Sequence, residues 1–272
     1  MTKNCQSTMT DLCKDLRIFK SIRDTIALSS SIRLLAHRSA DGDSLGSMIA
    51  MGRFLTDQMG KEVYMPYPES FPIRYSFLES YCNGFRHDCN NKDCLTILLD
   101  CSSSSRIDYG SNSSLPPVDI LIDHHEGVPD IGDIIYKDTH APAAGLLVYR
   151  FLKFAEAEFT PEISDAIYTA ILTDTGQFAF SGTTVECFNV AGFLVEHGAS
   201  PERVAREVYW NHSMSYISNM RTALNSLKFY ANGKLSIIQL THDNVDHPNL
   251  LNQTEGIVDL GIMIEGVEIA LL

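Results

Sequence analysis

The stretch "ILIDHHEG", residues 120–127, places an aspartate and two histidines directly after a run of aliphatic side chains. A continuous aliphatic run is typical of a strand buried on both faces, as in a parallel sheet covered by other elements. Packing gives no reason for three side chains that can bind metals to follow such a strand. The stretch therefore predicts a parallel sheet and points to a function at the end of this strand.

Similar aliphatic runs alternate with helical patterns along the first part of the chain. Strands are predicted over residues 31–37, 62–67, 94–100 and 118–123. Helices are predicted over residues 9–28, 43–60, 142–158 and 161–174. The second helix should stop at Gly60, because glycine is favoured in the left-handed position after a helix. This alternation is typical of a doubly wound α/β domain with a parallel sheet.

The organisation changes after about residue 198. We expect a first domain over residues 1–198, a helical linker over 199–228 and the beginning of a smaller α/β domain over 229–272. Residues 213–230 continue the helical pattern, and Asn232–Gly233 favours a tight turn between two strands. The chain stops in the apolar run "GVEIALL", residues 266–272, so we expect the second domain to be incomplete.

The balance of charge limits the classes of partner. The chain has 272 residues and a net charge of −13, from 21 basic and 34 acidic side chains. Long duplex DNA and anionic membrane surfaces need a broad basic face, so neither is an expected partner. No segment reaches the roughly 18 consecutive apolar residues of a membrane span, and the N-terminal residues lack the apolar core of a secretory signal. A cytoplasmic protein is therefore expected.

Seven cysteines are scattered along the chain, an odd number that does not suit a disulfide framework. We expect them to be reduced thiols. Cys82, His87, Cys89 and Cys94 lie close enough in sequence to suggest zinc, but their spacings are not those of a zinc knuckle. A polar surface loop is the favoured interpretation of this segment.

Side chains that can bind a metal stand where the predicted strands end. The carboxyl ends of parallel strands meet at one edge of a sheet, where open α/β folds bind ligands, so distant segments can form one site. The loop after the first strand adds two carboxylates on either side of Gly42, which lets the backbone turn tightly. The candidate metal ligands are His37, Asp41, Asp43, Asp100, His124 and Asp174.

Two imidazoles and four carboxylates form a ligand set that suits Mn²⁺, whose preference lies between oxygen-only magnesium cages and sulfur-rich zinc sites. A single aspartate after a strand has a structural explanation, because it often caps the next helix. The whole set has none, since so many carboxylates at one sheet edge would repel one another without cations. A divalent metal site is therefore the favoured hypothesis.

Four motifs in order resemble those of the DHH phosphoesterase superfamily, which is named after the triplet seen here at residues 123–125. They are "HRSADGDSLGS" (37–47), "LLDCSSSSRID" (98–108), "LIDHHEG" (121–127) and "AILTDTGQFAFSGTT" (170–184). The resemblance runs from about residue 32 to the C-terminus. The segments "TDTGQFAFS" and "NQTEGIVDLGIMIEGVEIALL" most resemble the branch that degrades very short RNAs and dephosphorylates 3′-phosphoadenosine 5′-phosphate (pAp). The chain departs from the common pattern at Ala40, where a proline is frequent, and at Ala144 and Gly145, where a serine is common.

The resemblance implies a site for two Mn²⁺ ions. His37 and Asp41 would hold one ion, Asp43, His124 and Asp174 would hold the other, and Asp100 would bridge them. Two adjacent cations can activate a water and stabilise the charge of a phosphoryl transition state. Such a site is that of a phosphoesterase.

Three further residues have implied roles around the ions. His125 would contact the substrate phosphate and act in catalysis, together with the bridging Asp100. Arg106 would neutralise substrate charge with its planar guanidinium group. Asp123 would orient a metal-bound histidine from behind.

The expected function is that of a manganese-dependent phosphoesterase acting from the 3′ end of very short oligoribonucleotides, on the 3′-phosphate of pAp, or on both. Hydrolysis of cyclic dinucleotides is an alternative within the same class. A different class also stays open, because an incomplete second domain would suit a protein that binds metal and nucleotide with little turnover. A homodimer is compatible with all of these functions.

Overall fold

The computed structural model describes residues 3–66, 71–87, 94–107, 115–241 and 256–272, and side chains from residue 15 onward. Two compact units make up the chain, Met1–Val208 and Tyr209–Leu272. The division between them falls within the range predicted for the helical linker. In the described part of the chain, no helix is both long enough and apolar enough to span a bilayer.

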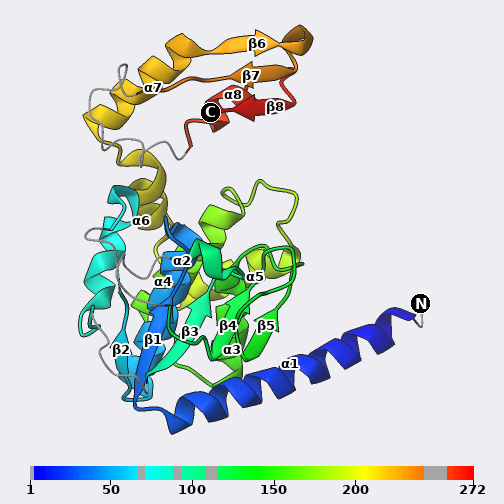
Figure 1. Ribbon diagram of the computed structural model, residues 1–272, viewed down its shortest axis with the longest axis vertical. Coiled ribbons are helices and arrows are strands. Elements are labelled where there is room, and N and C mark those ends of the chain that lie inside the picture. Colours follow the sequence, from blue (N-terminus) through cyan, green and yellow to red (C-terminus); the bar gives the residue numbers. More distant parts are fainter. Residues whose placement is uncertain (1–2, 67–70, 88–93, 108–114, 242–255) are drawn as a thin grey trace. The chain divides into compact units, whose positions relative to one another are not determined.

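A five-stranded parallel sheet forms the centre of the first unit (Figure 1). In the sheet order β2-β1-β3-β4-β5, its strands are β1 (Ser31–Leu35), β2 (Glu62–Tyr64), β3 (Leu95–Leu99), β4 (Ile120–Asp123) and β5 (Ile134–Lys137). The predicted α/β fold with a parallel sheet is confirmed. Each of the four predicted strands is present within its predicted range, and β5 is an additional strand that the sequence pattern did not reveal.

The order of the strands reverses between β1 and β3. After β1 the chain adds β2 on one side of it and then β3 on the other, and both pair with β1 in parallel. In sheets of this order, ligands bind in the crevice outside the carboxyl ends of the two strands at the reversal. This crevice lies between the segments that begin at Ala36 and at Asp100.

Both faces of the sheet are covered, which explains the aliphatic runs. On one face, Phe19 of the first helix meets Tyr136 of β5 edge-on, with ring centroids 4.8 Å apart. On the other face, Leu35, Leu98 and Leu121 form a buried cluster with apolar side chains of the connecting segments. Strands β1 and β3 are therefore buried at every position.

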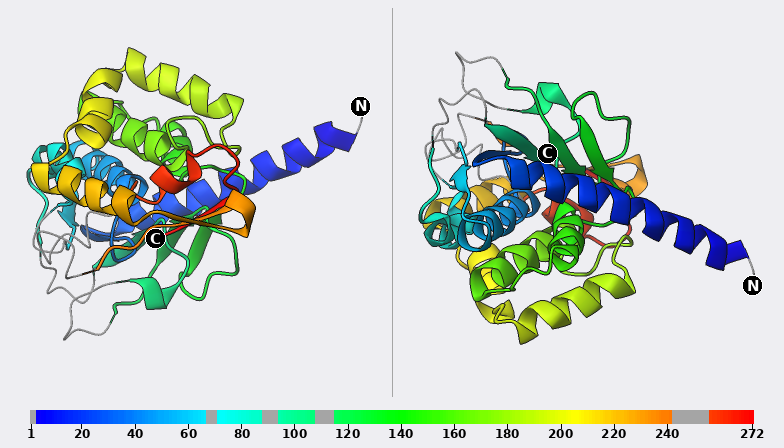
Figure 2. Two further views of the ribbon diagram at one scale, coloured as in Figure 1. Left: turned by 90° about the horizontal axis from the view of Figure 1, so that it is seen from above. Right: turned by 90° about the horizontal axis from the view of Figure 1, so that it is seen from below.

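The helices of the first unit are α1 (Lys3–Leu28), α2 (Gly42–Arg53), α3 (Ala144–Phe154), α4 (Pro161–Asp174), α5 (Val185–Glu196) and α6 (Pro201–Ala205). Figure 2 shows α1 as one long helix running across this unit. After α2, a π-helical turn at Phe54–Gln58 carries the helical path to Gly60, whose φ of +63° is the left-handed conformation expected there. Shorter 3₁₀ segments lie at Ile73–Cys82 and Ser104–Arg106.

Glycines bring α4 against α2 and α3 at backbone distance. A Cβ atom at Gly46 would overlap the carbonyl group of Ala166, and one at Gly42 would overlap the side chain of Thr173. On α3, a Cβ atom at Gly145 would overlap α4 in the same way. Larger residues would force these helices apart. The glycines therefore hold the end of α4 beside the beginning of α2.

The second unit contains helices α7 (Met214–Ser226) and α8 (Asp259–Ile262) and a sheet of β6 (Lys228–Tyr230), β7 (Leu235–Ile237) and β8 (Ile269–Leu271). As predicted, β6 and β7 form an antiparallel pair around Asn232–Gly233, both of which have positive φ angles. The helix predicted over residues 213–230 ends earlier, at Ser226. The helical pattern of its last residues is overridden because they pair with β7.

Candidate metal centre

Asp100 lies at the reversal point of the sheet, directly after β3. Its φ of +58° is rare outside glycine, and strain of this kind concentrates at functional sites. The residue is 2% exposed. Its Oδ2 accepts a hydrogen bond of 2.6 Å from Ser44 Oγ, whereas Oδ1 has no hydrogen-bond donor among the described residues. A buried carboxylate oxygen without a donor is costly, unless a cation binds there.

His37 and Asp41 form a group with Asp100 on one side. His37 Nε2 lies 3.6 Å from Asp100 Oδ2 and 3.8 Å from Asp41 Oδ2. The His37 Nδ1–H donates to the carbonyl of Arg38 at 2.6 Å, so in the neutral ring Nε2 carries the lone pair. Asp41 caps α2, since its Oδ1 accepts from two backbone N–H groups, and its Oδ2 still faces His37.

Asp43, His124 and Asp174 form a second group on the other side. His124 Nε2 lies 3.6 Å from Asp43 Oδ2 and 3.3 Å from Asp174 Oδ2. Asp43 is 1% exposed and accepts hydrogen bonds from the N–H groups of Ala144 and Gly145, at the beginning of α3. These bonds to a helix N-terminus favour the charged form of a buried carboxylate.

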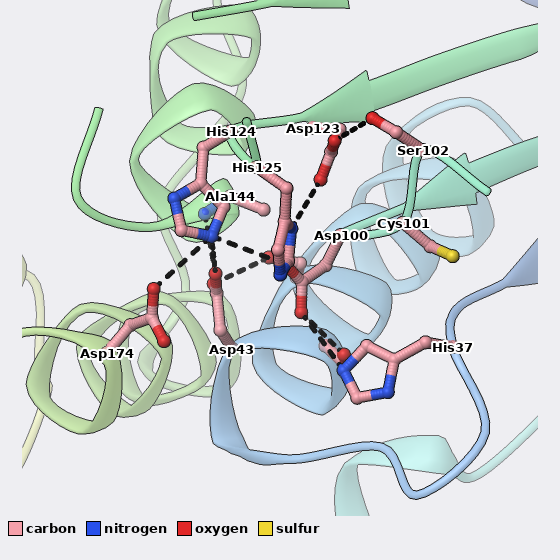
Figure 3. A network of polar contacts seen from close by, with 12 residues as sticks. His37, Asp43, Asp100, Cys101, Ser102, Asp123, His124, His125, Ala144 and Asp174 are labelled. Carbon is pink, nitrogen blue, oxygen red and sulfur yellow. Dashed lines mark hydrogen bonds and ion pairs between the residues drawn. The ribbon is translucent and has the colours of Figure 1, made fainter. Parts of the chain in front are cut away.

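Asp100 joins the two groups. Its Oδ1 lies 3.4 Å from His124 Nε2, while its Oδ2 faces His37 (Figure 3). The Nδ1–H of His124 donates to the carbonyl of Ala141 at 3.1 Å, so this ring also turns Nε2 toward the carboxylates. The structure thus brings together all six residues proposed as ligands, with both histidines held by backbone carbonyls.

The geometry of the two groups fits divalent cations. Ligand atoms about 2.1 Å from one ion lie roughly 3.0–3.6 Å from each other at the usual coordination angles. The nitrogen–oxygen separations here run from 3.3 to 3.8 Å, longer than the usual hydrogen-bond distance and close to that spacing. Together with the unpaired oxygen of Asp100, these separations fit a divalent metal site.

The same crowding changes the pKa values of the metal-free site. Burial, with the carboxylates of Asp100 and Asp174, raises the pKa of Asp43 well above its ordinary value. Burial likewise raises the pKa of Asp174 to about 6, although His124 opposes the change. Burial alone would lower the pKa of His37, but its contacts with Asp100 and Asp41 raise it to about 10. Protons are therefore retained where cations would bind.

His125 lies beside the two groups and is held by Asp123. The buried Asp123 Oδ1 accepts a hydrogen bond of 2.8 Å from His125 Nδ1, and its Oδ2 lies 3.4 Å from Lys137 Nζ. Burial opposes the change, but the bonds from His125 and Ser102 lower the pKa of Asp123 to about 2. Asp123 thus orients His125, whereas backbone carbonyls orient His37 and His124.

No contact between the Arg106 side chain and the metal groups is seen among the described residues. Arg106 is exposed at the end of the 3₁₀ segment Ser104–Arg106, and no ion pair of its side chain is seen among the described residues. Its carbonyl accepts a hydrogen bond of 2.7 Å from the Arg38 N–H, which ties this segment to the loop that carries His37. Its predicted contact with the substrate stays a prediction.

Two residues at the site have no counterpart among the predicted ones. Lys137 ends β5, and its Nζ also donates to Ser102 Oγ at 2.8 Å. Ser44 supports Asp100 from the beginning of α2. Ser44 stands inside the first motif and could have been found there, but Lys137 lies on the strand that sequence patterns missed.

The alternative zinc cluster receives no support from the described residues. Cys89 lies outside them, and Cys82, His87 and Cys94 belong to none of the groups of potential ligands found there. Cys82, Cys94, Cys101 and Cys187 form no disulfide among the described residues. The prediction that the cysteines are reduced thiols stays a prediction.

A family model supports the assignment. Residues 31–171 match the DHH family, N-terminal domain. The chain belongs to the DHH family. Five of the six proposed ligands fall inside the matched range, and Asp174 follows it by three residues.

Several relatives share one name. The chain is 28% identical over 242 residues to the bifunctional oligoribonuclease and PAP phosphatase NrnA of Thermus thermophilus, covering 85% of this chain and 72% of the relative. It is also 28% identical over 195 residues to the protein of the same name from Bacillus subtilis, with coverage of 68% and 59%. Both names describe enzymes that cleave phosphoester bonds, which confirms the predicted enzyme class at the level of the family.

A solved structure shows the same fold. The exopolyphosphatase-related protein of Bacteroides fragilis superposes with a TM-score of 0.79 at 23% identity, covering 92% of this chain and 77% of that chain. The likeness concerns the fold alone. The chain spans less than two thirds of the Bacillus subtilis relative, so the relatives' activities are considered below as a proposal.

Proposed function

We propose that this protein is a two-metal phosphoesterase that hydrolyses very short oligoribonucleotides, the 3′-phosphate of pAp, or both. The observation that carries the proposal is Asp100, whose buried carboxylate lies between the two groups of potential ligands. Mn²⁺ suits this mixture of imidazole and carboxylate ligands. The names of the relatives supply the substrate class.

His37, Asp41 and Asp100 would hold one cation, and Asp43, His124, Asp174 and Asp100 the other. When bound, two cations activate a water and neutralise charge on the phosphoryl group. Without them the carboxylates have an excess of negative charge and would repel a phosphate. Metal binding is therefore a condition for substrate binding as well as for the reaction.

His125 is the residue suited to protonate the leaving oxygen. Its Nδ1–H is fixed by Asp123, and the ring is 35% exposed, so Nε2 stays accessible to a substrate. A carboxylate behind an imidazole holds one tautomer and stabilises the charged ring. Lys137 stabilises Asp123 in turn, which keeps this carboxylate ionised while His125 exchanges its proton.

An activity panel on the 272-residue chain tests the proposal. The chain is stripped with a chelator, dialysed, and assayed with a diribonucleotide, pAp and cyclic di-AMP after addition of Mn²⁺, Mg²⁺ or no metal. We expect hydrolysis of the diribonucleotide or of pAp with Mn²⁺ and none without metal. Release of mononucleotides and of inorganic phosphate is followed by chromatography.

Three outcomes would contradict the proposal. Activity that survives removal of metal would rule out the two-metal site as the catalytic centre. Hydrolysis of cyclic di-AMP without hydrolysis of either linear substrate would move the protein to the cyclic-dinucleotide class. A chain that binds Mn²⁺ by calorimetry but cleaves none of the three substrates would be a binding protein rather than an enzyme.

A further inference from the structure

The turn after α4 has an unusual backbone. Gly176, Gln177 and Phe178 follow one another with φ angles of +53°, +60° and +64°. Left-handed residues normally occur singly, and two of these three are not glycine, so the turn is strained. It is nevertheless held firmly, because the Phe178 N–H donates to Thr175 Oγ1 at 3.0 Å and the Phe180 N–H donates to the Thr175 carbonyl at 3.0 Å.

The turn holds an aromatic ring in solvent. Phe180 is 61% exposed, although apolar rings are normally buried. Its ring packs over Gly176, where an added Cβ would lie 2.5–2.7 Å from three ring atoms. Glycine is therefore favoured at this position, by the φ angle and by the close approach of the ring. The strained turn therefore holds the Phe180 ring with one aromatic face exposed.

The turn that carries this face adjoins a ligand candidate along the chain. Gly176 is two residues from Asp174, the ligand candidate at the end of α4. On its other side, the turn approaches Pro142 at Gly182, where an added Cβ would be 3.9 Å from the Pro142 Cβ. Pro142 follows Ala141, whose carbonyl holds His124. The turn thus follows one ligand candidate in the chain and comes near the segment that holds another.

We propose that Phe180 is a stacking platform for a nucleobase of the substrate. The inference rests on the proposed function, because it assumes that the phosphate of a nucleotide binds at the metal groups. Residues 176–184 contain no charged side chain, so the turn can accept a base without attracting or repelling phosphate. Every base has an aromatic face, and stacking therefore binds bases with little selectivity among them. The platform would favour nucleotides over phosphate compounds that lack a base.

The test separates the base from the phosphates. Phe180→Leu keeps an apolar side chain over Gly176 but removes the aromatic face, and Phe180→Tyr retains it. With pAp as substrate, we expect Phe180→Leu to raise KM about tenfold and Phe180→Tyr to leave it unchanged. With ribose 3,5-bisphosphate, which lacks the base, Phe180→Leu should have no effect. Leu28→Ala is the control, because Leu28 is 91% exposed and precedes β1, at the opposite edge of the sheet.

A binding measurement makes the inference independent of turnover. Stacking quenches 2-aminopurine fluorescence, so the 2-aminopurine analogue of pAp should be quenched by the wild-type chain and by Phe180→Tyr, but much less by Phe180→Leu. Equal KM increases on both substrates would show that Phe180 only supports Asp174. If KM and quenching are both unchanged in Phe180→Leu, Phe180 is not a base platform. Sedimentation of the variant would then show whether the ring is a contact between copies of the chain or an ordinary surface residue. If the wild type cleaves no substrate but quenches the 2-aminopurine analogue, and Phe180→Leu does not, the proposed function fails and the base platform stands.

Discussion

Two clusters of charged side chains in the first unit differ in the source of their positive charge. In one, Arg150 of α3 binds Glu186 through two bonds of 2.9 and 2.6 Å and binds Asp138 at 2.8 Å. The chain itself supplies the cation, in the two-bond geometry that is strongest for guanidinium and carboxylate. In the other, the carboxylates of Asp41, Asp43 and Asp174 lie around Asp100. Among the described side chains, their partners there are only histidines and hydroxyl groups.

The pKa values of carboxylates in the two clusters change in opposite directions. Burial alone would raise the pKa of Asp138, but the bonds from Arg150 lower it, as is usual for a paired carboxylate. Burial and neighbouring carboxylates instead raise the pKa of Asp43 and Asp174. The Arg150 cluster is complete in the folded chain, whereas the cluster around Asp100 offsets only part of its negative charge, by retaining protons, until cations bind. We infer that the first cluster serves stability and the second serves function.

The largest expected effect follows from neutralising the bridging residue. Asp100→Asn should lower Mn²⁺-dependent hydrolysis of the diribonucleotide by about a thousandfold, because an amide cannot offset the charge of two cations. The fold should persist, since Asn also tolerates a positive φ. Steady-state kinetics and circular dichroism measure the two properties.

The matched control for this variant is Asp57→Asn, which removes one charge from an exposed helical pair with Arg53. Its activity should equal that of the wild type, since surface pairs contribute little. If Asp100→Asn retains Mn²⁺-dependent activity, Asp100 does not bridge the ions. The distinction between the two clusters would then lose its functional meaning.

The sequence predicted the ligand candidates around Asp100 but not the groups that hydrogen-bond to them. The triplet at 123–125 and the acids after β1 and β3 stand out because aliphatic strands precede them. The partners of Asp43 leave no such signal, because they are backbone N–H groups of Ala144 and Gly145. Asp123 was expected to orient a metal-bound histidine, but its side chain bonds His125 instead. Strand patterns do not specify the direction in which a side chain points.

The fold was predictable for similar reasons. Strands with two covered faces have an aliphatic pattern, but β5 is an edge strand with one buried residue among its four, so its pattern is weak. Lys137 was missed with it. In the second unit, Asn232–Gly233 made the turn predictable. The end of α7 was not predictable, because it depends on the pairing of Lys228–Tyr230 with β7 and not on local helix preference.

A smaller effect is expected when the complete cluster loses its cation. Arg150→Met leaves Asp138 and Glu186 without their partner, which should lower the free energy of unfolding by about 2 kcal/mol, because the cluster is only partly buried. In a unit of this size, the melting temperature should fall by about 4–8 °C. Arg86→Met is the control, since Arg86 is 64% exposed in its pair with Glu62 and should cost under about 1 kcal/mol. Equal losses in the two variants would show that the Arg150 cluster has no special role in stability.

The smallest effect has the opposite sign. In metal-free protein at neutral pH, Asp174→Asn should raise the free energy of unfolding, because ionised Asp174 is unfavourable in the fold and an amide removes that charge. Its pKa changes from 3.8 to about 6, which corresponds to about 3 kcal/mol, discounted to about 1 kcal/mol for the partial exposure of the side chain. The gain should be full above about pH 6, shrink as the pH falls toward 4, and vanish below it, where Asp174 is protonated in both states.

Asp138→Asn is the comparison for that variant, because the pKa of Asp138 is lowered rather than raised. Its replacement should destabilise the protein at neutral pH, and the loss should disappear only as the pH falls below the ordinary value of 3.8. With saturating Mn²⁺, the wild type should become more stable than Asp174→Asn, because bound metal stabilises the folded wild type and the Asn side chain cannot replace the Asp174 carboxylate as a ligand. Thermal unfolding of both variants from pH 4 to 8, with chelator and with Mn²⁺, measures each sign. If Asp174→Asn destabilises the metal-free protein as Asp138→Asn does, the carboxylates around Asp100 are already compensated within the chain, and they do not form a cluster that awaits its cations.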